Sequence, residues 1–227
     1  EVREKIGGRL VLDFLVKEGD QLPKKGKRTY KTEESLKAGS TGSIRFKLWE
    51  GDITYPVNDN RPIGLFEIKG AHFNDGVIAA GAELVCEYEV RDSGNIVLEV
   101  SVPSIGASFP SGRNFYSRQE GQIDYTKASK LVKDQSEYTL ARLNEMASKI
   151  DDPRLDQARL KLELAESLQT GECDPEISKQ ALDNVQEAKR LLALARQEHL
   201  KEIHQLELDK VIGFFDKVVR KHARPSE

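Results

Sequence analysis

The residue types that most often carry out catalysis or bind metal ions are few in this chain and far apart. The four histidines are His72, His199, His204 and His222. Because His199 and His204 are five residues apart, they would lie on different faces of a helix and could not bind one ion together. The sequence contains no P-loop, no G-x-S-x-G, no H-E-x-x-H and no paired C-x-x-C motif. It therefore indicates neither an enzyme nor a metal site.

The two cysteines are also poor candidates for nucleophiles. Cys86 falls on the apolar face of an alternating segment, where a buried and unreactive thiol is the usual outcome. Cys173 lies in an expected loop without a basic neighbour to activate it. Because the two are far apart in unrelated settings, they do not indicate a disulfide scaffold, and we expect a reducing, cytoplasmic compartment.

Composition excludes several classes of protein. Hydrophobic residues make up 38% of the 227-residue chain, which is enough to build a core and argues against general disorder. Charges of both signs are interspersed and the net charge is −3, so we expect no nucleic-acid partner. No apolar run approaches the roughly 18 residues of a membrane span. The chain begins Glu-Val-Arg-Glu with no signal-peptide pattern, and we expect it to be part of a longer soluble protein.

Glycine content separates two halves of the chain. Fifteen of the 17 glycines lie in residues 1–121, where turn-forming residues recur at the spacing of an all-β sandwich or barrel. Residues 122–227 are rich in strong helix formers and nearly free of chain breakers. The fold class we expect is α+β and multidomain, with an antiparallel β-sandwich of seven to eight strands followed by an α-helical bundle.

Period-two alternation predicts strands in the first half, each with one apolar face. The clearest segments are 83–91, 96–102, 44–49 and 10–16, and shorter strands are predicted near 27–31, 52–57 and 64–69.

Helical spacing of apolar residues predicts three antiparallel helices in the second half. Pro153 and Pro175 are well placed to begin the second and third helices. The stripe of the first helix is Leu131, Val132, Leu140, Leu143, Ala147 and Ile150. Because the pattern from Pro175 to His222 would make a rod of about 70 Å, we expect a break between about His199 and Gly213.

Five segments in the β half resemble, in order and spacing, motifs of the DnaK-type heat-shock chaperones. Residues 15–23 (LVKEGDQLP) resemble the strand and turn ending in "nnTTIP", and 24–32 resemble the next strand. Residues 44–52 (IRFKLWEGD) resemble the strand ending in "QGE", and 59–70 (DNRPIGLFEIKG) resemble "DNksLGqFnLdGI". Residues 83–102 resemble the hairpin that follows. The resemblance covers roughly residues 6–102, and the helical half is compatible with the family's lid.

The resemblance implies a substrate-binding domain that holds extended hydrophobic segments of unfolded polypeptides, with a helical lid. It implies an ATPase domain outside this chain, where ATP would bind, and co-chaperones as further partners. The implied peptide-binding residues are Ile6, Gly7, Tyr30, Thr32, Leu36, Ile44, Phe46 and Leu84. Ile6 and Leu36 take the places of the two arch residues in this comparison. Ordinary core packing is the competing interpretation for Ile44, Phe46 and Leu84.

The sequence also departs from the family. Residues 32–43 are about four residues longer than the family's second arch loop, and the short first lid helix has no counterpart between 102 and 124. These departures keep open a second function, a dedicated interaction scaffold or holdase without general peptide binding. An unrecognised hydrolase is a further alternative, which the absence of catalytic motifs disfavours.

The last predicted helix, 208–222, carries a strongly apolar strip. Its members are Val211, Ile212, Phe214, Phe215, Val218 and Val219. Packing onto the other helices is the ordinary interpretation of such a strip. Self-association, a partner groove and membrane-surface binding are the alternatives.

Overall fold

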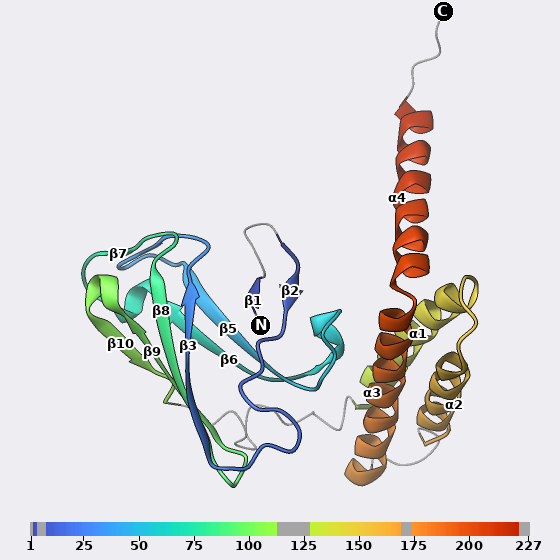
Figure 1. Cartoon of the computed structure of the whole chain (residues 1–227), viewed down its shortest axis with the longest axis horizontal. Helices are drawn as coiled ribbons and strands as arrows, with labels where there is room; N and C mark the ends of the chain where they lie inside the picture. The colour runs from blue at the N-terminus through green and yellow to red at the C-terminus, as the bar shows by residue number, and fades with distance from the viewer. Residues whose placement is uncertain (1, 4–7, 113–127, 169–173, 223–227) are drawn as a thin grey trace, which may run out of the picture. The chain divides into compact units, whose positions relative to one another are not determined.

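The computed structural model describes residues 2–3, 8–112, 128–168 and 174–222. The fold is α+β, with an antiparallel β region followed by four helices (Figure 1). The chain divides into two compact units, 1–122 and 123–227, one residue from the boundary expected from composition. Each unit has its own hydrophobic core.

The β unit contains four small antiparallel sheets among its described residues. β3, β8, β9 and β10 form a four-stranded sheet in the order β10-β9-β8-β3. The pairs β1–β2, β4–β7 and β5–β6 form two-stranded sheets. The strands are β1 (Val2–Arg3), β2 (Leu10–Val11), β3 (Lys24–Lys31), β4 (Leu36–Lys37), β5 (Ser43–Glu50), β6 (Arg61–Lys69), β7 (Val77–Ile78), β8 (Glu83–Val90), β9 (Ile96–Val102) and β10 (Ala107–Pro110).

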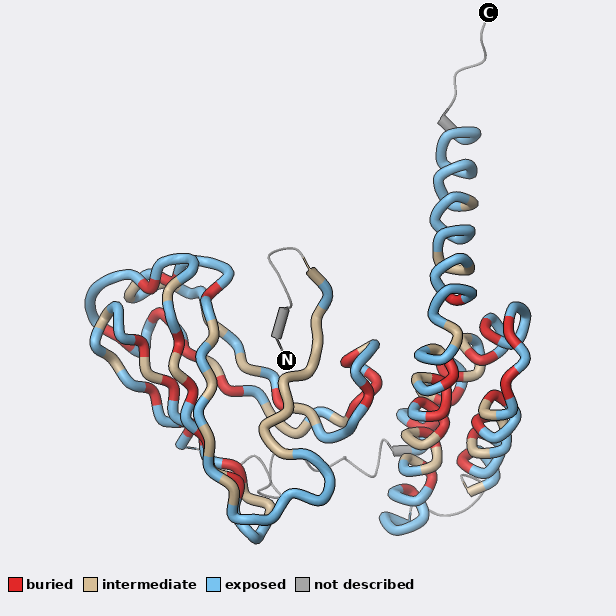
Figure 2. Tube along the Cα trace, viewed as in Figure 1, coloured by how far each residue is buried: buried red, intermediate tan, exposed pale blue. Residues whose placement is uncertain are grey.

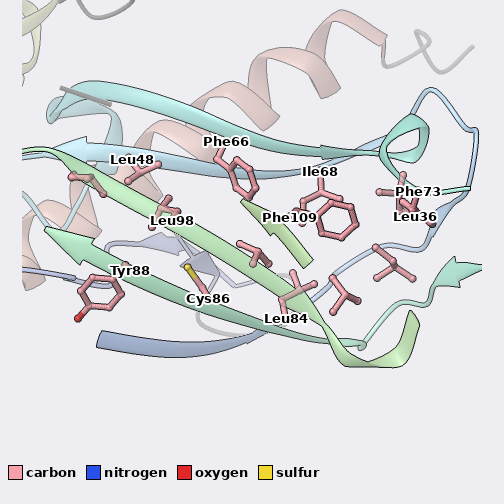
Figure 3. Close-up of a cluster of buried hydrophobic side chains, with 14 of the residues drawn as sticks. Leu36, Leu48, Phe66, Ile68, Phe73, Leu84, Cys86, Tyr88, Leu98 and Phe109 are labelled. Carbon is pink, nitrogen blue, oxygen red and sulfur yellow. The ribbon is translucent and has the colours of Figure 1, made fainter. Parts of the chain in front are cut away.

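Strict alternation places β8 and β9 at the centre of this unit. The predicted inward positions are all buried, and these are Leu84, Cys86, Tyr88, Val90, Ile96, Leu98, Val100 and Val102. Figure 3 shows side chains of this cluster between the β5–β6 pair and the β8–β9 pair. Outward positions such as Glu87 and Glu99 are exposed. The predicted strands at 83–91, 96–102 and 44–49 are therefore confirmed.

Of the other predicted strands, the one at 52–57 was wrong and the one at 10–16 was too long. Residues 52–57 form no strand and lead into a 3-10 helix at Val57–Asp59. Their two apolar residues, Ile53 and Val57, are buried, but Asn60 holds the segment through side-chain hydrogen bonds in place of a ladder. In 10–16 only Leu10–Val11 is a strand, although Leu15 and Val16 pack against the core.

The helical unit consists of α1 (Ala128–Ala147), α2 (Pro153–Ser167), α3 (Pro175–Glu198) and α4 (Leu200–His222). Proline occupies the first turn of α2 and α3, as predicted. An aspartate caps each of these helices, since Asp152 accepts a hydrogen bond from Arg154 N at 2.9 Å and Asp174 from Glu176 N at 2.8 Å. No helix in the described residues combines the length and hydropathy needed to cross a membrane.

The core of this unit is formed mainly by α1, α2 and α3. The buried face of α1 consists of Val132, Ser136, Thr139, Leu143 and Met146. Ile150, just after the end of the helix, is buried as well. The predicted stripe was partly wrong, because Leu131 and Ala147 are exposed while two hydroxyl residues are buried. Small residues on the facing helices, such as Ala158, Ala165 and Ala188, are fully buried, which allows close packing.

The predicted break in the long rod lies at His199, between α3 and α4. At this point His199 Nε2 lies 3.2 Å from the carboxylate of Asp152. Beyond the break, α4 is exposed along most of its length (Figure 2), and Ile203 is its one buried residue among those described. The ordinary interpretation of the apolar strip was therefore wrong, since Val211 is 65% exposed and Phe214 is 71% exposed.

Candidate peptide-binding site

Strand β5 carries the two residues, Ile44 and Phe46, that the resemblance places in a peptide pocket. Both lie on the same face of the strand as Leu48, which is buried, whereas Arg45 and Lys47 are exposed. Ile44 pairs with Ile68 and Phe46 with Phe66 across the β5–β6 ladder. Ile44 and Phe46 pack against the core but are only partly buried. They therefore lie at its margin, where part of each side chain is accessible.

Phe46 lies between two other aromatic rings. Its ring centroid is 5.7 Å from that of Phe66, at an interplanar angle of 39°. Tyr30 meets it edge-on at 6.4 Å from the other sheet. Tilted and edge-to-face contacts at these distances are favourable beyond simple burial. The contacts with Tyr30 and Phe66 fix the orientation of the Phe46 ring, and the Tyr30 contact connects β5 to β3.

A hydrogen bond to Asp13 fixes the position of Tyr30. The phenol oxygen donates to Asp13 Oδ2 at 2.8 Å, and Arg28 Nε lies 3.6 Å from the same carboxylate oxygen. Burial, together with this hydrogen bond, raises the pKa of Tyr30 far above its ordinary value. The ring of Tyr30 contributes an apolar edge beside Phe46.

Thr32 follows β3 and is buried. Its hydroxyl donates to Ala79 O at 2.7 Å, and its N–H donates to Ala82 O at 3.0 Å. Gly81 N–H in turn donates to Thr32 O at 2.8 Å. The side chain and backbone of Thr32 thus fasten the turn before β8 to the start of segment 33–42, which lies within the residues 32–43 that the resemblance compares with the second arch loop.

Leu36 and Leu84 belong to the core. They are 3% and 2% exposed, respectively, and lie in the same cluster. Leu36 forms part of β4, paired with Ile78 of β7. This placement does not fit the arch position that the sequence comparison gave it, because almost none of its side chain is accessible. For Leu84, the burial agrees with core packing, the competing interpretation.

Segment 33–42 is held down at several further points. Ser35 Oγ accepts a hydrogen bond from Ala80 N at 2.9 Å, and Gly39 N–H donates to Gly70 O at 2.8 Å. Gly70 permits this approach, because a Cβ at that position would lie 2.5 Å from Lys37 O. Segment 33–42 is therefore held by β4 and by its contacts with residues 70–82.

The remaining candidates are the residues of the first arch loop, the Cys86 thiol and the side chains that could bind a metal ion. Ile6 and Gly7 lie outside the described residues. Burial, aided by nearby carboxylates, raises the pKa of the Cys86 thiol to about 11, so it is not a nucleophile at neutral pH. Among the described residues, no group of three His, Cys, Asp or Glu side chains is placed to hold a metal ion.

The structure brings together Tyr30, Ile44 and Phe46 at the margin of the core, and it adds two residues that the sequence comparison missed. Phe66 packs against Phe46, and Asp13 positions Tyr30. Asp13 was detectable in principle, because it interrupts a run of apolar residues at 10–16. The contribution of Phe66 depends on its partner in the β5–β6 register, which the sequence does not specify.

No protein-family model matches this chain, and no curated protein matches it either. The function proposed below therefore depends on the motif resemblance in residues 6–102 and on the geometry of the aromatic group at 30, 46 and 66.

Proposed function

We propose that this chain is the substrate-binding region of a DnaK-type chaperone, in which a β-sandwich holds an extended polypeptide and the helices serve as a lid. The partial exposure of Ile44 and Phe46 is the observation that carries this proposal. In the proposal, an ATPase domain outside this chain controls the affinity for peptide, and co-chaperones act on that domain.

The chemistry of an unfolded chain fits such a surface. Extended polypeptide presents backbone hydrogen-bonding groups and scattered apolar side chains, so a receptor that accepts many sequences needs one apolar contact and main-chain hydrogen bonds. Ile44 and Phe46 supply the apolar contact, and Tyr30 supplies an aromatic edge beside it. In the proposal, main-chain hydrogen bonds from neighbouring segments supply the remainder.

Magnitudes indicate how the affinity would be divided. Burying a Leu-like side chain of the peptide contributes about 1.5–3 kcal/mol. Micromolar binding requires about −8 kcal/mol, so main-chain hydrogen bonds and neighbouring contacts must supply the larger share. Loss of the apolar contact alone should therefore weaken binding about 10- to 100-fold.

Fluorescence anisotropy with a labelled, Leu-rich extended peptide tests the proposal. We expect micromolar binding by the parent chain and at least about tenfold weaker binding by Phe46→Asp or Ile44→Asp. Leu65→Asp is the matched control, because Leu65 lies on the same hairpin, is 42% exposed, and alternates with the inward-facing Phe66. Fluorescence of Trp49, the single tryptophan, checks that each variant remains folded.

One observation favours a second function, a dedicated interaction scaffold or holdase. The burial of Leu36 and the hydrogen bonds of Thr32 hold segment 33–42 against 70–82, where general peptide binding would call for an accessible arch. Absence of binding across peptides of varied sequence, with a folded parent chain, would favour this second function over the first.

A further inference from the structure

We propose that the C-terminal half of α4 is a self-association surface, which pairs antiparallel with the same helix of a second copy of this chain. The surface is an apolar stripe formed by Leu208, Val211, Ile212, Phe215, Val218 and Val219. It differs from the apolar strip described above by including Leu208 and omitting Phe214. All six side chains are between 39% and 65% exposed. The proposal concerns only the helical unit and does not depend on peptide binding by the β unit.

The stripe does not face the other helices of its own unit. Ile203 is buried against them, and Lys210, seven residues later on the same face, bonds Glu145 of α1. Leu208 is five residues from Ile203 and so lies on another side of the helix. Folding of the unit therefore covers a different face of α4 and leaves the stripe in solvent.

The spacing of the stripe is that of a coiled-coil seam. Leu208, Val211, Phe215 and Val218 follow steps of three, four and three, which are the a and d positions of a heptad repeat. Ile212 and Val219 widen the seam on one side. A seam of this kind buries its side chains against a second helix of similar length, which the stripe itself can supply.

The distribution of charge selects the antiparallel arrangement. Glu207 and Lys221 each lie seven residues from Phe214, so the three residues follow one edge of the stripe. Antiparallel pairing centred on Phe214 places Glu207 of each copy opposite Lys221 of the other. In parallel pairing this edge would instead face the other edge of the partner's stripe, which is apolar, so these opposite charges would not meet. Glu207 bonds Arg196 within its own unit, yet its side chain remains 45% exposed and accessible to a second copy.

The same charges argue against a membrane surface as the occupant. Helices that lie on anionic membranes carry a polar face dominated by Lys and Arg. Along residues 208–221 of α4 the polar side carries two aspartates, Asp209 and Asp216, among four basic residues, so it is not uniformly basic. The mixed face fits a protein partner with its own mixed charges.

Sedimentation equilibrium of the whole chain tests the proposal. We expect a dimer with a dissociation constant in the micromolar range, weakened at least about tenfold by the double substitution Val211→Asp and Phe215→Asp. The matched control is Leu160→Asp with Leu164→Asp on α2, where both leucines are also more than half exposed. Circular dichroism verifies that helix content is retained. A monomeric parent chain, or an equal effect of the control pair, would overturn the proposal.

Disulfide crosslinking tests the orientation, in a Cys173→Ser background that leaves the buried Cys86 in place. In antiparallel pairing, Leu208 of one copy faces Val218 of the other. A mixture of the Leu208→Cys and Val218→Cys variants should therefore crosslink faster than either variant alone. Faster crosslinking by the single variants would contradict the antiparallel arrangement. Binding of phosphatidylserine vesicles by a monomeric parent chain would identify a lipid surface as the occupant and refute self-association.

Discussion

Asn60 holds the irregular segment before β6 with both ends of its side-chain amide. Its oxygen accepts from Ile53 N at 3.0 Å, and its nitrogen donates to Ile53 O at 2.7 Å and to Val57 O at 3.0 Å. The side chain is 3% exposed. With a net contribution of about 1 kcal/mol for each hydrogen bond, Asn60→Ala should reduce the free energy of unfolding by about 3 kcal/mol.

Asn60→Asp sharpens this prediction. A carboxylate can still accept from Ile53 N, but it cannot donate to the two carbonyl oxygens and instead repels them. We therefore expect the Asp variant to lose about 2 kcal/mol or more despite its nearly identical shape. Asn58→Ala is the control in the same segment, because Asn58 is exposed and its substitution should change stability by less than about 0.5 kcal/mol.

Urea unfolding monitored by Trp49 fluorescence measures the effect in the correct unit. Trp49 is the only tryptophan and lies on β5, so its emission reports the β unit, whereas circular dichroism at the helix minimum reports mainly the helical unit. The midpoint by fluorescence should fall in both Asn60 variants, with little change in the helical transition. An unchanged fluorescence midpoint in Asn60→Ala, or an equal shift in Asn58→Ala, would refute this account of the segment.

Three further predictions concern other parts of the chain. The side-chain hydrogen bond from Arg154 lowers the pKa of Asp152 to about 2, below its unfolded value, so this interaction stabilises the fold above about pH 4 and is lost as the pH falls towards 2. Asp152→Asn should lower the free energy of unfolding of the helical unit by about 1 kcal/mol at pH 7, allowing for solvent screening, as measured by urea unfolding. If parent and variant still differed by the same amount at pH 2, this prediction would be contradicted. Gly70→Ala should destabilise the β unit by about 1–3 kcal/mol, because the added Cβ would lie 2.5 Å from Lys37 O and 2.6 Å from Ser40 O. An unchanged urea midpoint of Trp49 fluorescence would show that the backbone of residues 37–40 lies farther from Gly70. Cys86 should react with a thiol reagent only after unfolding, and rapid labelling of the native chain at that position would contradict its burial.

The sequence was most informative where one rule acted alone. In β8 and β9 the alternation of residue types matched burial at every inward position, because a single buried face determines each choice. In α1 the rule failed, because Ser136 and Thr139 lie in the buried face. Thr139 satisfies its hydroxyl by donating to Gln135 O at 2.7 Å, so it can be buried without an apolar signature, whereas the buried Ser136 Oγ has no hydrogen-bond partner among the described residues.

The candidate site depended on tertiary relations that no local pattern specifies. The alternation of β5 correctly separated Ile44 and Phe46 from Arg45 and Lys47, but their partial exposure depends on which elements cover them. Leu36 was placed on a loop by comparison with a shorter family loop, whereas the structure pairs it with β7 and buries it. The β4–β7 pairing joins residues about 40 positions apart in the sequence, and no local pattern around Leu36 indicates it.

Site-specific photocrosslinking tests the central claim most directly, because it locates bound peptide and does not infer its position from affinity. The benzoylphenylalanine side chain would replace Phe46 in one variant and Leu65, on the opposite face of the same hairpin, in the other. We predict that an extended, Leu-rich peptide is captured at position 46 and that unlabelled peptide competes for this capture. Capture at position 65 alone, or at neither position while the peptide binds, would contradict a peptide site at the margin of the β core.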